Sequence, residues 1–376
     1  MDWNRWRPEF PITEHLTHFN HAGVSPVSRR VATAVTDFIT DATLLDADKE
    51  RRWSERGEAT RAAFARLVGA RADEIAFVKN TSEGLSLVAA GLPWRPGDNV
   101  IAVDGEYPSN VYPWFGLRRC GVETRLVRPV NGRVQVEDVA ALVDDRTRVV
   151  SVSFVDWNSG ARTDLSPIGA FCRTRDILFC VDGIQGVGAV RLDVERAQID
   201  CLAVGGHKWL LAPEGCGYLF VSHRVIDRIE SVLHGWKSVS DADTYLPYHF
   251  TPRPDAAKFE PGSPSLLGIA ALGAAIDLLL EVGPEHIERR LFELTDRLAT
   301  GLRARGAHVV SPWDDGQRSG ILVFRLGDDP RGLQAALLRE RFNVRIRGGG
   351  IRVAPHFYNN EDDIDRLLHT LDRLTP

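Results

Sequence analysis

Seven short apolar runs within residues 75–221 constrain the fold of this chain most strongly. Each run is rich in β-forming residues, and an amphipathic or glycine-bounded segment separates it from the next. Strands that alternate with helical segments in this way predict a mostly parallel α/β sheet covered by helices. The predicted strands are residues 75–78, 100–103, 124–127, 149–154, 177–181, 201–204 and 217–221.

Helical patterns flank the predicted sheet on both sides. The stretch 234–258 is rich in proline and aromatic residues but has little periodicity, so we interpret it as a loop that leads to a second unit. Beyond it, strand-like patterns at 320–326 and 344–353 alternate with helical ones and predict a compact α+β unit. The predicted helices are residues 31–45, 50–68, 263–279, 284–305 and 362–374.

The length of 376 residues favours about two domains. We expect an N-terminal segment, 1–18, that packs with the small domain. The large α/β domain is predicted over 19–258 and the smaller C-terminal α+β domain over 259–376.

Composition excludes several classes of protein. A net charge of −5, from 46 Lys plus Arg against 51 Asp plus Glu, argues against a nucleic-acid-binding surface. No run of eighteen uncharged apolar residues predicts a membrane span, and the N-terminus does not resemble an export signal. The five cysteines form no C-x-x-C pair, and several lie in apolar runs, so we expect buried thiols, a cytoplasmic location and no metal site.

Two of the predicted strands lead to chemically distinctive side chains. Asp182 follows the run 177–181, and Lys208 follows the run 199–204. In open α/β sheets ligands bind beyond the carboxyl ends of strands, so both side chains are expected in one pocket. A lysine forms a Schiff base with an aldehyde, and a carboxylate keeps a pyridine nitrogen protonated. Alone, Asp182 reads as a helix N-cap and Lys208 as a solvated cation, but together they predict pyridoxal 5′-phosphate.

Other strand ends add weaker candidates, each with a structural alternative. Thr81 and Ser82 begin a predicted helix, where they would bind the cofactor phosphate or serve as ordinary caps. Tyr107 would stack on a flat cofactor, or would be a core or interface tyrosine. Asn158 would bond the phenolic oxygen of the cofactor, or would form a tight turn.

From residues 19–23 to 351–353 the chain resembles the fold type I pyridoxal-phosphate enzymes of the class V aminotransferase group. This group includes cysteine desulfurases, selenocysteine lyase and isopenicillin N epimerase. The strongest matches are the sequences at 181–185 and 206–208. The resemblance implies a large domain with a mostly parallel seven-stranded sheet, a smaller α+β C-terminal domain and a homodimer with shared active sites.

The resemblance also implies individual roles. Lys208 would carry the cofactor, Asp182 would pair with its pyridine nitrogen, and Gln185 would bond its phenolic oxygen side. The phosphate would be bound by Ser82, by His207 and, from a neighbouring subunit, by Ser263.

The substrate side is also implied by the resemblance. Arg352 falls where the family binds an α-carboxylate, with Arg345 and Arg347 as possible helpers, although three close arginines also suit a solvated strand edge. Arg162 and the loops at 21–26 and 234–249 would build the pocket for the substrate side chain. His21 and His356 would act there, or would be structural histidines.

Three departures from the family pattern narrow the reaction. Cysteine desulfurases have a cysteine before the carboxylate-binding arginine, but residues 345–352 contain none, which disfavours persulfide formation. Tyr107 replaces the usual stacking histidine, as in the epimerase branch. Gly205 replaces a serine, which removes one hydroxyl contact to the phosphate.

These observations predict an enzyme acting at the α-carbon of a small amino-acid-like substrate, with the freed Lys208 amine as the base. We expect a C–S β-elimination lyase or an epimerase. An aminotransferase is the alternative within the enzymes, and a non-catalytic binding or assembly protein is the alternative of another class.

Overall fold

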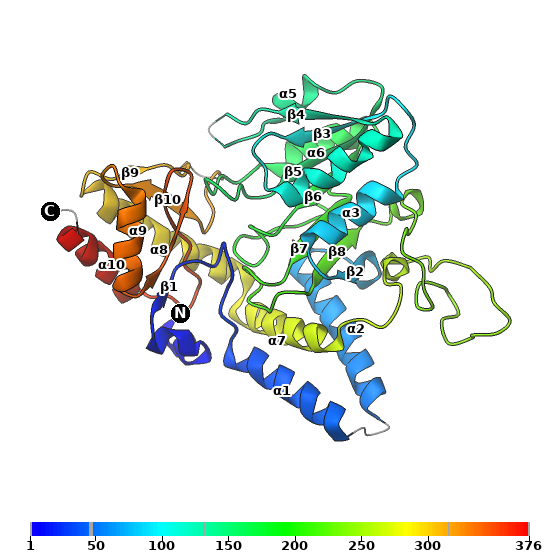
Figure 1. The fold of residues 1–376 in the computed structure, drawn as a ribbon, viewed down its shortest axis with the longest axis horizontal. Helices are drawn as coiled ribbons and strands as arrows, with labels where there is room; N and C mark the ends of the chain where they lie inside the picture. Colours follow the sequence, from blue (N-terminus) through cyan, green and yellow to red (C-terminus); the bar gives the residue numbers. More distant parts are fainter. Residues whose placement is uncertain (1, 45–47, 131, 315, 375–376) are drawn as a thin grey trace.

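The computed structural model describes residues 2–44, 48–130, 132–314 and 316–374. Seven strands form the central sheet in the order β2-β8-β7-β6-β5-β3-β4 (Figure 1). From β4 to β7 the strands are parallel, and β8 runs antiparallel to both β2 and β7. The mostly parallel sheet that the sequence predicts is therefore confirmed, strand by strand. The strands are β2 (Ile75–Val78), β3 (Asn99–Val103), β4 (Glu123–Val127), β5 (Thr147–Ser153), β6 (Leu178–Asp182), β7 (Cys201–Gly205) and β8 (Gly217–Val221).

Both faces of the sheet are covered, which explains why its strands are continuous apolar runs. In β6, Leu178 and Cys180 join the buried cluster beneath helix α3 (Thr81–Gly91). Phe179 and Val181 alternate with them and join the cluster on the opposite face, which also contains residues of α6 (Leu165–Thr174). This alternation fixes the register of β6 in the sheet. The last residue of β6 lies at the carboxyl edge, as in the parallel strands beside it.

Three long helices pack together beside the sheet, with α1 and α2 both in contact with α7 (Figure 1). They are α1 (Arg29–Leu44), α2 (Lys49–Val68) and α7 (Leu266–Val282). All three were predicted, but the last residue of the predicted helix 31–45 lies outside the described residues. Two short helices lie between β3 and β5 in the sequence, α4 (Tyr112–Phe115) and α5 (Val136–Ala140), and the second is labelled in Figure 1.

The C-terminal unit is built on a four-stranded antiparallel sheet in the order β12-β13-β10-β9. Its own buried cluster includes Phe324, Leu337 and Leu367. The two predicted strand regions and the closing helix are present. The elements are α8 (Pro284–Arg303), β9 (His308–Val309), β10 (Leu322–Arg325), α9 (Pro330–Arg339), β11 (Phe342–Asn343), β12 (Arg345–Arg347), β13 (Gly350–Val353) and α10 (Glu361–Leu374).

Helix α7 follows the predicted domain boundary at residue 259 but packs with the central sheet. Its buried residues Leu272 and Ile276 share one cluster with Val204 and Tyr218 of the central sheet. The next helix, α8, begins in that cluster at Ile287 and ends in the cluster of the C-terminal unit. We therefore propose that the large domain extends through α7 and that the small domain begins within α8.

The N-terminal segment lies beside the C-terminal unit (Figure 1). Strand β1 (Thr17–His18) pairs in parallel with β11. Arg7 forms an ion pair with Asp363 at 2.8 Å, and Phe10 stacks on Tyr358 with ring centroids 3.8 Å apart. Residues 2–18 thus contact the C-terminal unit, and Glu9 also pairs with Arg30 of α1.

The predicted loop 234–258 contains no helix or strand in its described residues before the short helix Ala256–Phe259. It exposes apolar side chains, above all Tyr248, which is 92% accessible. Among the described residues no single helix is long and apolar enough to cross a membrane. Only α7 and α8 together pass by length and composition, with a 77° bend between them.

Candidate active site

Asp182 and Lys208 meet at the carboxyl edge of the central sheet. Asp182 is the last residue of β6 and is buried, and its Oδ1 accepts a hydrogen bond from the Ile184 N–H at 3.0 Å. Lys208 follows β7 by three residues. The two side chains are close enough that each one shifts the pKa of the other. The structure thus brings together the pair that the sequence singled out.

Burial moves the pKa values of both groups toward neutrality. It raises the pKa of Asp182 to about 6, although the Ile184 hydrogen bond and the Lys208 charge oppose the shift. It lowers the pKa of Lys208 to about 8, and the positive charges of Arg352 and Arg347 lower it further, against the attraction of Asp182. A lysine that loses its proton near pH 8 is suited both to imine formation and to use as a base.

Two aromatic side chains, Tyr107 and Trp157, lie next to one another on the side of Lys208. The Nζ of Lys208 lies 5.5 Å from the centre of the Tyr107 ring, and Tyr107 is half exposed. Trp157 contacts Tyr107 edge to face, with ring centroids 5.6 Å apart, and its Nε1 donates to the Gly105 carbonyl oxygen. The placement of Tyr107 suits the predicted stacking role. Trp157 was not predicted, although it lies in the polar stretch after β5 that also contains Asn158.

Glu106 is a second residue that the sequence analysis missed. Its carboxylate accepts hydrogen bonds from the Ser153 N–H at 2.7 Å, from the Ser153 hydroxyl and from the Asn110 amide at 3.2 Å. Burial raises the pKa of Glu106 to about 7, and the charge of Asp182 adds to the shift. Ser153 is the β5 partner of Asp182 in the sheet. Glu106 therefore ties the backbone before Tyr107 to the strand next to Asp182.

The N-terminus of α3 provides the expected phosphate site. Asn80 caps the helix by accepting from the Glu83 N–H at 2.9 Å. The hydroxyl of Thr81 is buried and has no hydrogen-bond partner among the described residues. Ser82 donates to the hydroxyl of Ser109 at 2.8 Å. A buried hydroxyl without a partner at a helix N-terminus is suited to an anionic ligand.

Loop 22–25 closes over the Lys208 segment. The Ser25 hydroxyl donates to the Lys208 carbonyl oxygen at 2.6 Å, and the Ser25 N–H donates to that of His207 at 2.9 Å. Gln185 donates from Nε2 to the Ala22 carbonyl oxygen at 3.0 Å and accepts from Trp209 Nε1 at 3.1 Å. Gln185 thus lies at the site with a second amide hydrogen left for a ligand. Burial and the Lys208 charge lower the pKa of His207.

Arg352 reaches the site from β13 in the C-terminal unit. The side chain is buried, donates from Nη1 to the Trp157 carbonyl oxygen at 3.0 Å and from Nη2 to Asn20 Oδ1 at 3.3 Å. Its Nε has no partner among the described residues. Burial, reinforced by the charges of Arg347 and Arg345, lowers the pKa of Arg352 to about 9. A buried guanidinium without a carboxylate partner is suited to bind an anion.

Asn158 has a different neighbour from the one predicted. Its Oδ1 accepts from the Gly348 N–H at 2.7 Å, at the turn between β12 and β13. The side-chain oxygen of Asn158 therefore links the loop after β5 to the β12–β13 hairpin. The predicted bond to the phenolic oxygen of the cofactor would have to come from the amide nitrogen.

His21 is not placed to contact a substrate. It is fully buried, donates from Nδ1 to the Ala354 carbonyl oxygen at 2.7 Å, and accepts at Nε2 from the Tyr358 hydroxyl at 2.8 Å. Burial and the neighbouring histidines keep the pKa of His21 well below its usual value. His356 is buried in the same cluster. The expectation that His21 binds substrate was wrong, because both ring nitrogens are used inside the fold.

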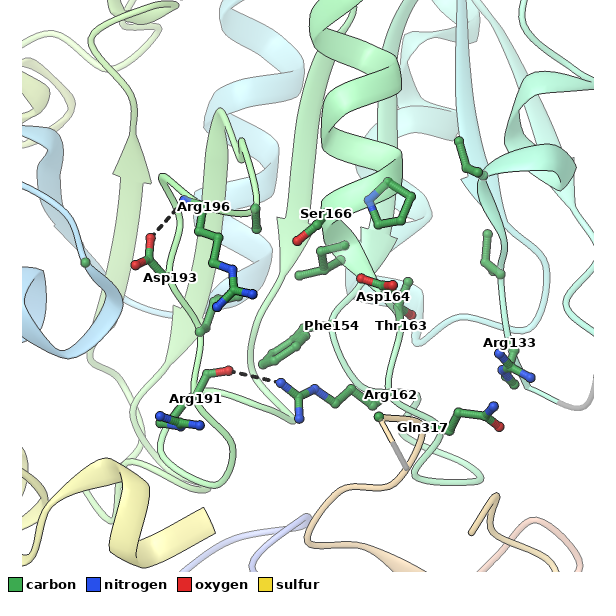
Figure 2. Close-up of a pocket in the computed structure, with 18 of the residues that line it drawn as sticks. Arg133, Phe154, Arg162, Thr163, Asp164, Ser166, Arg191, Asp193, Arg196 and Gln317 are labelled. Atoms are coloured by element: carbon green, nitrogen blue, oxygen red, sulfur yellow. Dashed lines mark hydrogen bonds between the residues drawn. The ribbon is translucent and has the colours of Figure 1, made fainter. Parts of the chain in front are cut away.

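Arg162 points into a different cavity, of about 950 Å³ (Figure 2). It pairs with Glu288 at 2.9 Å and donates to the Arg191 carbonyl oxygen. The described residues that line this cavity include Arg133 and Arg196 but neither Lys208 nor Asp182. The predicted substrate role of Arg162 is therefore also corrected.

Ser263 is exposed in the single chain and precedes the N-cap of α7. Its role toward the phosphate of a neighbouring subunit stays a prediction. At Gly205 a Cβ would lie 3.0 Å from Ile184 and 3.3 Å from the His207 ring, so a larger residue would require these side chains to shift. Among the described residues no group of His, Cys, Asp or Glu is arranged to hold a metal ion.

A covered, mostly parallel sheet with a lysine and a carboxylate at its carboxyl edge defines the class of fold type I pyridoxal-phosphate enzymes. A profile of the aminotransferase class-V family matches residues 18–367, and the chain belongs to this family. It is a pyridoxal-phosphate-dependent enzyme, as the sequence predicted.

Relatives and solved structures agree with this assignment over nearly the whole chain. A probable cysteine desulfurase of Methanothermobacter thermautotrophicus is 30% identical, with 98% of this chain and 97% of the relative covered. An uncharacterized aminotransferase of Schizosaccharomyces pombe is 29% identical, with 98% and 95% covered. The apo cysteine desulfurase of Thermococcus onnurineus superposes with a TM-score of 0.90 at 24% identity, with 99% and 97% covered. The cystine C–S lyase C-DES superposes with a TM-score of 0.90 at 23% identity, with 98% and 100% covered.

The residues present fit the cofactor. The buried Thr81 hydroxyl, left without a partner among the described residues, lies at the helix terminus suited to the phosphate. Asp182 lies at the end of β6, within electrostatic reach of the Lys208 amine. When bound, the cofactor supplies an electron-withdrawing ring that stabilises negative charge at the α-carbon of an amino acid.

Proposed function

We propose that this enzyme acts at the α-carbon of an amino-acid-like substrate and cleaves a carbon–sulfur bond at the β-position. The observation that carries the proposal is the Lys208 amine, whose pKa is lowered to about 8, within electrostatic reach of the buried Arg352. Arg352 binds the α-carboxylate, which holds the α-hydrogen near that amine. The Lys208 amine removes the proton. Epimerisation, in which the proton returns to the opposite face, uses the same residues and is the second version of the proposal.

Several relatives bear the name cysteine desulfurase, so persulfide formation is the function to be distinguished. That chemistry needs an accessible thiolate beside the substrate. The described hairpin of β12 and β13 contains no cysteine. Cys216 lies near the Lys208 loop but is buried, donates to the Pro213 carbonyl oxygen, and has a pKa that burial raises to about 11. Cys120 is exposed but precedes β4 at the opposite edge of the sheet. These placements favour elimination over persulfide transfer.

Transamination is the alternative within the same chemistry. It requires the proton taken from the α-carbon to be delivered to the cofactor, and the Lys208 amine serves that step as well. The alternative of a non-catalytic scaffold is set aside, because the family and the structural neighbours are enzymes. The proposal includes a homodimer with shared sites and a cytoplasmic location, supported by the exposed aromatic segment near Tyr248 and the free cysteines.

The test compares the wild type with Lys208→Ala after loading with pyridoxal phosphate. We expect a visible absorbance band in the wild type that is lost or displaced in the variant. Each loaded protein is then incubated with S-substituted L-cysteines and with L-cysteine. Pyruvate and a thiol in equal amounts, formed by the wild type alone, would support the lyase.

Other products point elsewhere. Alanine with a protein-bound persulfide from L-cysteine would overturn the lyase in favour of desulfuration. Loss of optical activity without pyruvate would leave epimerisation, and a keto acid that accumulates with aminated cofactor would identify transamination.

A further inference from the structure

The arginines of the β12–β13 hairpin carry positive charge that the described carboxylates do not neutralise. Arg345, Arg347 and Arg352 form no ion pair with any aspartate or glutamate that the structure describes. Elsewhere in the C-terminal unit, ion pairs are formed by Arg290, Arg297, Arg305, Arg318 and Arg373. Asp156 attracts Arg352 through space, but its own carboxylate accepts hydrogen bonds from Asn158 and Ser159. The hairpin therefore has room for more than one negative charge.

Arg347 is the second arginine that faces the site. Its guanidinium lies 5.5 Å from the centre of the Trp157 ring, which contacts Tyr107, whose ring in turn lies beside the Lys208 amine. Its positive charge lowers the pKa of both Lys208 and Arg352. Arg347 and Lys208 thus lie beside the same pair of aromatic rings, Trp157 and Tyr107. Arg347 is also close enough to Arg352, the arginine assigned to the α-carboxylate, to shift its pKa.

The free hydrogen-bonding capacity of Arg347 distinguishes it from Arg345. Arg345 donates to Asn343 Oδ1 at 3.2 Å and to the Val344 carbonyl oxygen at 3.1 Å, which ties it back to its own strand. Arg347 makes one side-chain hydrogen bond among the described residues, to the Ile346 carbonyl oxygen at 2.7 Å. Its strand partner is Gly350, so no side chain opposite fills the space beside it.

We propose that Arg347, supported by the Trp157 ring, binds a second anionic group, and that the substrate is an amino acid with an acidic side chain. This inference rests on the proposed function, because Arg352 must hold the α-carboxylate for the side chain to reach Arg347. A carboxylate or a sulfinate on the substrate side chain would offer the planar or forked acceptor that a guanidinium recognises. A neutral side chain of the same size would leave the positive charge of Arg347 uncompensated.

The experiment uses two ligands that differ by one charge. S-carboxymethyl-L-cysteine and S-carbamoylmethyl-L-cysteine have nearly the same size and shape, but only the first carries a side-chain carboxylate. Binding to the cofactor-loaded enzyme is measured by stopped flow from the first change in visible absorbance, before product accumulates, which gives a Kd for each ligand. We expect the wild type to bind the acidic ligand about tenfold more tightly, as a hydrogen-bonded charge pair predicts.

Two variants make the test specific. Arg347→Gln should remove the preference by weakening the acidic ligand alone and leaving the Kd of the neutral ligand within about twofold, since the lost interaction is with the side chain. Arg173→Gln is the matched control. It removes the same charge from the end of α6 that precedes β6, at the opposite edge of the sheet, and should keep the preference.

The outcomes separate this inference from the proposed function. No absorbance band, or no response to either ligand, would refute the proposed function itself. A normal band with equal affinities for the two ligands in the wild type would overturn the second anionic subsite alone. So would an Arg347→Gln variant that keeps the preference, or one that loses both ligands equally.

Discussion

Glu106 and Asp182 are two carboxyl groups buried near one another, after β3 and at the end of β6. The pKa of each is raised, mainly by burial, and for Glu106 the charge of Asp182 adds to it. Near neutral pH the two groups together therefore carry less negative charge than two ionised carboxylates would. Since a bound pyridine nitrogen needs a negative partner, Asp182 is the group that gains from keeping its charge while Glu106 holds a proton.

A pH-dependent stability measurement tests the burial of Glu106. Its pKa rises from 4.5 to about 7 on folding, so the folded protein binds the proton more tightly than the unfolded chain. The stability from this group is complete below pH 4.5 and is lost as the pH rises through 7. Between pH 5 and pH 8, we expect the free energy of unfolding of cofactor-free wild type to fall by roughly 2 kcal/mol more than that of Glu106→Gln.

Urea unfolding curves of both proteins at several pH values measure this difference. Glu106→Gln keeps the size and one acceptor of the side chain but cannot titrate. Parallel pH profiles for the two proteins would show that Glu106 titrates normally and would contradict its assignment as a buried, protonated group.

At the scale of single residues, the sequence predicted best where the signal was local. Asp182 and Lys208 could be found because each comes at or just after the end of a buried apolar run. In open α/β sheets ligands bind beyond the carboxyl ends of such strands. His21 and Arg162 were misplaced because their partners, Tyr358 and Glu288, lie far away in the sequence. Glu106 comes soon after β3, but its burial and its hydrogen bonds depend on β5, where Ser153 donates to it.

At the scale of elements, the strands were predicted more securely than the domain boundary. Strands β3, β6, β7 and β8 are buried along their whole length, so each reads as a short, mostly apolar run with clear ends. Helix α7 was assigned to the small domain because it follows a long loop. Its small residues in fact allow close packing on α2, and no property of α7 alone identifies that partner.

Two glycine-to-alanine substitutions test this packing. Alanine is a better helix former than glycine by roughly 1 kcal/mol in both helices. At Gly57 of α2 a Cβ would meet only Ile269, at 3.8 Å, so Gly57→Ala should raise the free energy of unfolding by about 0.5 to 1 kcal/mol. At Gly273 of α7 a Cβ would lie 2.2 Å from the Thr60 hydroxyl, so Gly273→Ala should lower it by about 1 to 3 kcal/mol.

Thermal and urea unfolding of the two variants beside wild type give the signs directly. A stabilising Gly273→Ala would mean that α7 and α2 separate readily, and would contradict the close contact of these helices.

At the scale of the whole molecule, the segment 232–250 exposes several large apolar side chains within a short stretch of chain, as interaction surfaces do. Tyr248 is 92% accessible, Leu246 69%, Tyr245 64% and Phe250 60%. We predict that the enzyme sediments as a dimer at micromolar concentration and that Tyr248→Asp with Phe250→Asp shifts it toward the monomer. Analytical ultracentrifugation checks both. A monomeric wild type would contradict the shared active site, and an unchanged dimer in the double variant would place the interface elsewhere.

The contact of the N-terminal segment with the C-terminal unit has a consequence for how the protein is made. Strand β1 pairs with β11, and Arg7 pairs with Asp363, across more than three hundred residues of chain. On the ribosome, residues 2–18 emerge before the surface of the C-terminal unit that they cover. The central sheet has all its strands by residue 221 and can form while translation continues. The contacts of the N-terminal segment with β11 and α10 can form only after both elements have left the exit tunnel.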